Sequence, residues 1–252
     1  MKTQVVLTVA ESKRLIAKGV SELGMIKRAF NEGLVVVSSG STNGYVVEEL
    51  FGESIDKTGY MTGKTLPSGV KMSQLKVGQS ISDVVFKDGE LTEEYDRQSA
   101  SENMSKDDVF VKGANALNYK KGVAGVLIGH PAGGTVGGSL GHIFGKRANL
   151  VIPIGLEKCI SSDIYEMAEK VNMDNEEYEG VPRLWPIRGT IVTEIEALQI
   201  LFDVEVNQLA AGGLAGAQGA VRLLVDGDKK ELDKLNKYID KIHGEPEFYQ
   251  FK

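Results

Sequence analysis

The chain has 252 residues, which is enough for one large globular unit or for a larger and a smaller one. Charged residues make up 25% of the chain, and its net charge is −6. This acidic balance argues against general binding to nucleic acid, which depends on clustered lysine and arginine. The single cysteine, Cys159, excludes a disulfide within the chain, and no cysteine or histidine cluster has metal-site spacing, so we expect no metal and no cofactor. The first ten residues turn polar too soon for a signal peptide, and no apolar run is long enough to span a bilayer. We therefore expect a cytoplasmic protein without a membrane partner.

Residues 9–30 carry apolar side chains at three- and four-residue steps, which predicts a helix. Gly19 and Gly24 weaken its middle, so two shorter helices are an alternative. Gly33 is typical of the residue after a helix C-terminus and leads into the next element.

Residues 34–37 are four apolar, mostly β-branched residues without polar alternation, which predicts a strand buried on both faces of a parallel sheet. A small polar turn follows at 38–43, and then a helix from about Asn43 to residue 51. Serine and threonine hydroxyls, main-chain N–H groups and a helix N-terminus favour a phosphate or carboxylate there. The same pattern also connects core strands to helices in α/β proteins that bind nothing at this position. The spacing matches neither the ATP-binding nor the dinucleotide-binding glycine motif.

Residues 60–98 are predicted to be an antiparallel addition, because Asp88-Gly89 separates two extended runs in the manner of a hairpin. Two further strands then end in polar, glycine-containing turns. One runs from about residue 107 into the turn 112–115, and the other, 123–129, runs into 130–135. In an open parallel sheet such turns gather at the carboxyl ends of the strands, where ligands bind.

These turns supply the predicted site. The candidate ligand-binding residues are Ser39, Gly40, Ser41, Thr42, Asn43, Gly113, Gly133, Gly134 and Thr135. The candidate catalytic residues are Lys112, Asn115 and His130. The side chain of His130 has an ordinary pKa that suits acid–base work near neutrality. Lys112 could hold a phosphate, a carboxylate or an enediolate through its positive charge. The alternative interpretation, a solvated lysine at a strand terminus, fits the pattern equally well.

The C-terminal part is predicted to form a separate unit. After a helix at 163–171 and an acidic linker at 172–180, residues 182–252 show the order β-α-β-β-α-β, with a last strand at 245–251, which is typical of a ferredoxin-like α+β domain. The expected fold is thus an open, mostly parallel Rossmann-like α/β domain at 1–181, flanked by helices, followed by this smaller unit. The loop 212–219 fits either a second ligand loop or a structural hairpin.

Four segments resemble, in the same order, those of ribose-5-phosphate isomerase type A. Gly40-Ser41-Thr42 resembles its first Gly-Ser-Thr loop, and residues 108–115 resemble its Asp-Gly-Ala-Asp strand end. Residues 132–134 are similar to its glycine-rich loop, and 150–158 to its strand that ends in Ser-Lys. The likeness covers most of residues 10–160 and extends to the superfamily of sugar-phosphate isomerases, glucosamine-6-phosphate deaminases and CoA transferases. It implies a cradle for a small anionic metabolite such as a phosphosugar or an organic acid.

The chain departs from this family at the positions of its acids. Isomerisation needs a carboxylate that moves a proton between adjacent carbons. The resemblance places the first acidic positions at Lys112, Asn115 and Ala116. It places the catalytic base near Leu140 and the loop lysine near Pro131. The resemblance therefore implies the ligand cradle without the ordinary isomerase activity.

Two classes of function follow. The first is a divergent isomerase-like enzyme. A CoA-transferase-like enzyme is an alternative that would need a nucleophilic glutamate. Glu102 resembles such a glutamate only weakly, and a solvated loop residue is the simpler interpretation of it. The second is a non-catalytic metabolite-binding or regulatory protein in which the C-terminal unit mediates homo-oligomer formation. The helix after the turn carries Glu48 and Glu49. Either one of them faces the ligand, or both lie at the surface.

Overall fold

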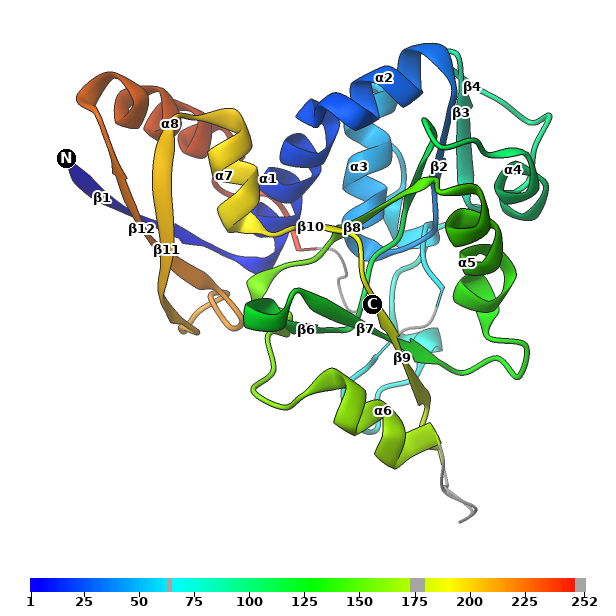
Figure 1. The fold of residues 1–252 in the computed structure, drawn as a ribbon. Helices are drawn as coiled ribbons and strands as arrows, with labels where there is room; N and C mark the ends of the chain where they lie inside the picture. The colour runs from blue at the N-terminus through cyan, green and yellow to red at the C-terminus, as the bar shows by residue number, and fades with distance from the viewer. Residues whose placement is uncertain (63–64, 173–179, 248–252) are drawn as a thin grey trace.

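The computed structural model describes residues 1–62, 65–172 and 180–247, which form a mixed α/β fold with three sheets (Figure 1). The largest sheet has the strand order β10-β8-β5-β2-β3-β4. Its strands are β2 (Leu34–Val37), β3 (Val84–Lys87), β4 (Glu90–Leu91), β5 (Val109–Val111), β8 (Asn149–Pro153) and β10 (Thr190–Val192). The four strands from β10 to β2 are parallel, and β3 and β4 add an antiparallel hairpin at one edge. The predicted α/β class is confirmed, and the sheet expected to be mostly parallel is a mixed sheet with a parallel part. The Rossmann-like and ferredoxin-like classifications stay predictions.

Helices cover both faces of this sheet, as the uninterrupted apolar character of its central strands requires. On one face lie α1 (Val9–Glu22), α2 (Gly24–Glu32) and α3 (Ser41–Phe51), and on the other α4 (Arg97–Asn103) and α5 (Gly134–Lys146) (Figure 1). Alternate strand residues enter different cores. Val35 and Val37 join the core that contains α1 and α3, whereas Val36 joins the core that contains α4 and α5.

The long N-terminal helical segment is divided into α1 and α2 at Leu23, which matches the alternative with two shorter helices. Gly19 has a packing role rather than a breaking one. A Cβ atom added to Gly19 would lie 2.7 Å from the Cα of Ala197 on α7 (Glu194–Leu201). The glycine therefore lets α1 and α7 approach closely.

A second sheet, with the order β1-β12-β11, joins the two ends of the chain. β1 (Lys2–Leu7) pairs antiparallel with β12 (Val221–Gly227), which pairs antiparallel with β11 (Val204–Ala211). The apolar stripe of α8 (Lys229–Ile242) and side chains of α1 and α7 pack with this sheet in the core that also contains β2 and β5. One continuous core thus spans the six-stranded sheet and this one.

The C-terminal segment is distributed over all three sheets. The strand expected to open a ferredoxin-like unit, 190–193, is β10 and pairs in parallel with β8 of the six-stranded sheet. The strand β9 (Arg183–Ile187) pairs with β7, and β1 pairs with β12. Strand pairing therefore does not follow a division at 181/182. The expected last strand, 245–251, lies partly outside the described residues, and residues 245–247 are not in a strand.

The third sheet corrects the expectation for residues 123–129. They form β7 (Val123–Ile128), which lies in an antiparallel sheet between β6 (Ala116–Asn118) and β9, not in the parallel sheet. The helix α6 (Ile164–Asn172) packs against this sheet. A continuous apolar run fits any strand that is buried on both faces, so the run alone does not identify its sheet. The linker predicted at 172–180 lies, apart from its end residues, outside the described part of the chain.

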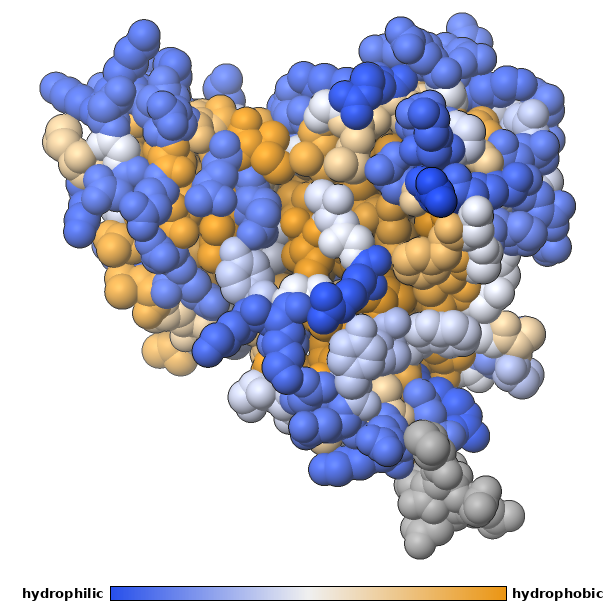
Figure 2. Space-filling view, in the orientation of Figure 1, coloured by the Kyte–Doolittle hydropathy of each residue, from blue (hydrophilic) through white to orange (hydrophobic). Residues whose placement is uncertain are grey.

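Figure 2 shows apolar side chains gathered over the sheet β1-β12-β11, on the left of the view. Leu209 on β11 and Leu214 in the following loop are 58% and 85% exposed. Association through this part of the chain stays a prediction. Among the described residues, no helix combines the length and the apolar character needed to cross a bilayer.

Candidate functional site

The predicted polar turn lies at the carboxyl end of β2, directly beside the end of β5. The main-chain N–H of Ser38 donates to the carbonyl of Val111 at 3.0 Å, and the Ser38 hydroxyl donates to the same carbonyl. Ser41 and Thr42 open α3, and within the described residues this helix has no side-chain cap on its N-terminal N–H groups. The site predicted at 39–43 and the turn that begins at Lys112 are therefore neighbours at one sheet edge.

Two of the main-chain donors expected to hold an anion are already occupied. The N–H of Ser39 donates to the Asp83 carboxylate at 2.5 Å, and the N–H of Gly40 donates to the carbonyl of Tyr60 at 3.1 Å. Asp83 also forms an ion pair with Arg97. The Asp83 carboxylate thus occupies a place in this turn where a bound anion would accept hydrogen bonds. The donors that remain for a ligand are the side-chain hydroxyls of the turn and the first N–H groups of α3.

Asn43 fixes the turn against β5 from a fully buried position. Its amide nitrogen donates to the Ser38 carbonyl at 2.7 Å. Its Oδ1 atom has no hydrogen-bond partner in residues 1–62, 65–172 and 180–247. A Cβ atom on Gly113 would lie 3.7 Å from this oxygen, so the glycine leaves it room on the β5 side. A buried amide oxygen without a donor is uncommon, and a ligand donor would satisfy it.

Three lysines surround the ends of these strands. Lys112 follows β5 and donates from Nζ to the carbonyl of Gly113 at 2.9 Å, and Lys158, which follows β8, donates to the carbonyl of Ala114 at 3.0 Å. Burial, then the charges of Lys158 and Arg97, lower the pKa of Lys112 to about 8 against the opposing effect of Asp83. Lys13 on α1 is also affected by Lys158: burial and that charge lower its pKa to about 8. Lys158 therefore links the other two lysines electrostatically.

Two glutamates complete this group. Glu157 lies in the 3-10 turn η4 (Leu156–Lys158) after β8, and its charge raises the pKa of Lys13. Glu194 follows β10 as the first residue of α7 and is fully buried. We call Lys13, Lys112, Glu157, Lys158 and Glu194 the lysine–glutamate cluster. Its members come from the ends of three parallel strands and from α1, which packs over them.

The second predicted loop lies elsewhere. His130, Gly133, Gly134 and Thr135 follow β7, which belongs to the antiparallel sheet, and the main-chain N–H of Ala132 donates to Nδ1 of the exposed His130. His130 and Gly133 line a cavity of about 910 Å³ together with Trp185 and other residues around β9. No residue of 39–43 or 112–113 lines that cavity. The structure therefore brings Ser39, Gly40, Ser41, Thr42, Asn43, Lys112 and Gly113 together and separates them from this loop.

The contacts of Asn115 and Glu102 indicate structural rather than catalytic roles. Asn115 accepts a hydrogen bond from the Leu127 N–H at 3.0 Å, so its side chain joins the β6–β7 hairpin. Glu102 is exposed on α4 and accepts a hydrogen bond from Gln98 of the same helix. The environment of Glu102 is that of a solvated surface residue.

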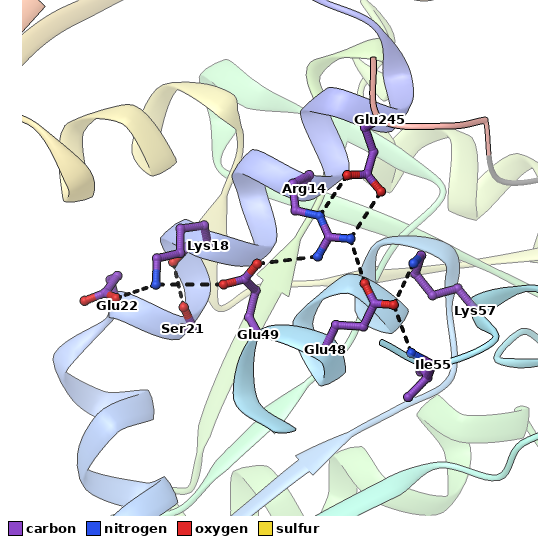
Figure 3. A network of polar contacts seen from close by, with 9 residues as sticks. All are labelled: Arg14, Lys18, Ser21, Glu22, Glu48, Glu49, Ile55, Lys57 and Glu245. Carbon is purple, nitrogen blue, oxygen red and sulfur yellow. Dashed lines mark hydrogen bonds and ion pairs between the residues drawn. The ribbon is translucent and has the colours of Figure 1, made fainter. Parts of the chain in front are cut away.

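Glu48 and Glu49 belong to an ion-pair network that ties α1, α3 and residue 245 together (Figure 3). The Arg14 guanidinium lies 2.7 Å from Glu48 and 3.1 Å from Glu245, and Lys57 lies 2.6 Å from Glu48. Against the effect of burial, hydrogen bonds from Lys57 and Arg14 hold the pKa of Glu48 below its ordinary value. The carboxylate of Glu48 is thus committed to protein partners.

Sequence reasoning missed Lys13, Glu157, Lys158 and Glu194 as site residues. A signal in the sequence was available for three of them. Glu157 and Lys158 end the segment 150–158, which resembles a strand that ends in Ser-Lys, and Glu194 follows the first strand expected in the C-terminal unit. Lys13 had none, since its position depends on how α1 packs across the sheet. Within the described ranges, no three histidine, cysteine, aspartate or glutamate side chains are placed to hold a metal ion.

Comparison of the chain with protein-family models, curated proteins and solved structures gave no match. The resemblance to sugar-phosphate isomerases therefore stays a prediction.

Proposed function

We propose that the protein binds a small anionic metabolite, a phosphosugar or an organic acid, at the carboxyl ends of β2, β5 and β8. Lys112 and Lys158 would hold the charged group, and the hydroxyls of Ser39 and Ser41 would add hydrogen bonds. The first N–H groups of α3 would contribute the favourable end of a helix dipole.

The observation that carries this proposal is the incomplete charge compensation of Lys112. The carboxylate that acts on it, Asp83, already pairs with Arg97 and accepts from the Ser39 N–H. A lysine in partly buried surroundings loses hydration, which disfavours its charged form unless an anion is near. A bound phosphate or carboxylate would supply that anion.

Two candidate functions share this binding site. In a divergent isomerase-like enzyme the bound metabolite is converted, and in a regulatory protein it is only sensed. The presence of Glu157, whose charge acts on Lys13, favours the enzyme, because this carboxyl group would replace one of the acids that are missing from the familiar positions. The surroundings of Glu102 give no support to a CoA-transferase-like nucleophile.

The binding proposal is tested by thermal unfolding in the presence of sulfate, ribose 5-phosphate, glucosamine 6-phosphate, citrate and acetyl-CoA. We expect at least one of these anions to raise the melting temperature of the wild type. Lys112→Met and Lys158→Met should lose most of this increase, because each removes a cation without leaving a buried charge. Lys237→Met, at an exposed position on α8, is the matched control and should respond as the wild type does.

His130→Ala separates this site from the cavity beside β9. If His130→Ala lost the ligand-induced increase in melting temperature and Lys112→Met kept it, the anion site would be misplaced. An anion that binds tightly without being converted would support the regulatory function over the enzyme.

A further inference from the structure

The Asp83 carboxylate makes, from within the chain, the contacts that a bound anion would make at the turn after β2. Its Oδ1 atom accepts a hydrogen bond from the main-chain N–H of Ser39 at 2.5 Å. Its Oδ2 atom forms an ion pair with Nη1 of Arg97 on α4. The side chain of Asp83 is only 9% exposed. Main-chain N–H groups and guanidinium groups are the usual donors to carboxylates and phosphates, so Asp83 occupies the place of a ligand.

Arg97 uses little of its hydrogen-bonding capacity on the protein. Within residues 1–62, 65–172 and 180–247, the one hydrogen bond of its side chain goes from Nη1 to Asp83. Its Nε atom is buried and has no acceptor in the same residues. A Cβ atom added to Gly138 of α5 would lie 4.0 Å from Nη2, so the guanidinium extends from α4 toward α5. A guanidinium presents its donors as a planar fork that matches two oxygens of an anion, and most of this fork is left for another partner.

Lys112 brings a second cation to the same edge of the sheet. It directly follows Val111, whose carbonyl accepts from the Ser38 N–H at 3.0 Å, so it leaves β5 beside the turn. Burial lowers the pKa of Lys112, and the charge of Asp83 opposes this effect while that of Arg97 adds to it. The single carboxylate of Asp83 thus serves two cations, and an anion with more charge would compensate them better.

The carboxylate of Asp83 lies at the end of an irregular segment. Asp83 directly precedes β3, and residues 76–83 form neither helix nor strand and are mostly exposed. A segment with so few buried groups adjusts at little cost to the sheet. A rotation of the Asp83 side chain would therefore release both Ser39 and Arg97.

We propose that Asp83 is an internal competitor for the anion site, and that a ligand anion displaces it and takes over its contacts with the Ser39 N–H and Arg97. Arg97 is then a further ligand-binding residue. This inference rests on the proposed function. It adds a condition on the ligand, because a tethered carboxylate competes at an effective concentration on the order of millimolar. This competition weakens every anion by the same factor. Weakly held monocarboxylates are thereby excluded, and the site selects a group with two or more negative charges, such as a phosphate or a tricarboxylate.

The competition is tested by calorimetric titration of sulfate into the wild type and Asp83→Asn. Asparagine has nearly the same shape and still accepts a hydrogen bond from the Ser39 N–H, but it carries no charge. We expect Asp83→Asn to bind sulfate roughly tenfold or more tightly than the wild type. Asp233→Asn, at an exposed position on α8, removes a charge elsewhere and should bind sulfate as the wild type does. If Asp83 only linked the turn to α4, its replacement would leave the sulfate affinity unchanged or lower it, and either result would overturn the inference.

Acetate, a monoanion with the chemistry of the Asp83 side chain, tests the condition on the ligand. We expect millimolar acetate to bind measurably to Asp83→Asn and not to the wild type. Equal acetate affinities for the two proteins would show that Asp83 does not compete.

The role of Arg97 is tested in the Asp83→Asn background, where its replacement leaves no unpaired carboxylate. Adding Arg97→Met should weaken sulfate binding roughly tenfold or more relative to Asp83→Asn alone. Adding Arg97→Lys keeps the charge without the planar fork and should restore part of the affinity. Adding Lys237→Met is the matched control and should have no effect. If Arg97→Met bound sulfate as tightly as its parent, Arg97 would not be a ligand-binding residue.

A last measurement uses the wild type and so does not depend on how the variants fold. In the protein labelled with nitrogen-15, we expect the resonances of the Arg97 Nε–H and the Ser39 N–H to shift together as sulfate saturates the site. Resonances that stay in place while calorimetry shows sulfate bound would overturn the inference and leave the anion-binding function standing. If neither the wild type nor Asp83→Asn bound sulfate, phosphate or citrate, the proposed function would be wrong as well.

Discussion

At the scale of single residues, Glu194 makes stability depend on pH. Its pKa is raised from 4.5 to about 7 in the folded protein, so the native state binds this proton more tightly than the unfolded chain. Its contribution to stability is therefore complete below the unfolded pKa and is lost as the pH rises through about 7. The shift corresponds to roughly 3 kcal/mol. We expect Glu194→Gln to gain about that much relative to the wild type between pH 4.5 and pH 8, measured by urea unfolding. A difference between the two proteins that is constant with pH would contradict this assignment.

Lys13 and Lys112 make ligand binding, too, weaken as the pH rises. Both have a pKa of about 8, and only their protonated forms attract an anion. A bound anion favours the charged form, so binding is coupled to proton uptake above this pH. We expect the affinity for sulfate to fall by roughly tenfold or more between pH 7 and pH 9, measured by calorimetry. Lys112→Met should bind more weakly and show a smaller fall. An affinity that does not change over this range would count against both lysines as ligand-binding residues.

At the scale of helices and strands, the contact between Arg14 on α1 and Glu48 on α3 is the best-buried part of the network in Figure 3. The side chains of Arg14 and Glu48 are 18% and 5% exposed. Arg14→Met would leave Glu48 with Lys57 as its one remaining cationic partner among the described residues. We expect a loss of about 3 kcal/mol in the free energy of unfolding, as for other broken buried pairs. Lys18→Met removes more exposed ion pairs with Glu22 and Glu49 and should cost less than about 0.5 kcal/mol. Equal losses for the two variants would show that burial does not determine the strength of this network.

The close approach of α1 and α7 is tested at Gly19. A Cβ atom there would meet the backbone of Ala197 at 2.7 Å, which side-chain movement cannot relieve. We expect Gly19→Ala to destabilise the protein by about 1–3 kcal/mol in spite of the better helix propensity of alanine. Gly24→Ala, in the first turn of α2, meets only the end of the Arg28 side chain at 3.6 Å and should be neutral or stabilising. Thermal unfolding of both variants measures the contrast.

Local elements followed from the sequence more readily than their arrangement in sheets. The strand 34–37, the helix after it and the hairpin at Asp88-Gly89 are set by short-range patterns, and the structure contains them. Sheet membership depends on partners distant in the chain, so β7 and β10 were assigned to the wrong neighbours. The turn at 38–43 and Lys112 were found because both follow buried strands. Lys13 became part of the site only through the packing of α1.

At the scale of the whole molecule, the described residues share a core that links both ends of the chain. β1 pairs with β12, and α1 contributes to the core of both the six-stranded sheet and the sheet β1-β12-β11. We therefore expect a single cooperative unfolding transition, with equal calorimetric and van't Hoff enthalpies. Two separated transitions, one of them assignable to residues 182–252, would instead support two independent domains.

The position of a bound anion tests the central claim most directly. A crystal grown in selenate, an analogue of sulfate with a strong anomalous signal, would show that position independently of any assay. We expect selenate within hydrogen-bonding distance of Lys112 or Lys158, beside Ser39 and the start of α3. Selenate bound only in the cavity between His130 and Trp185, with the lysine–glutamate cluster empty, would contradict it.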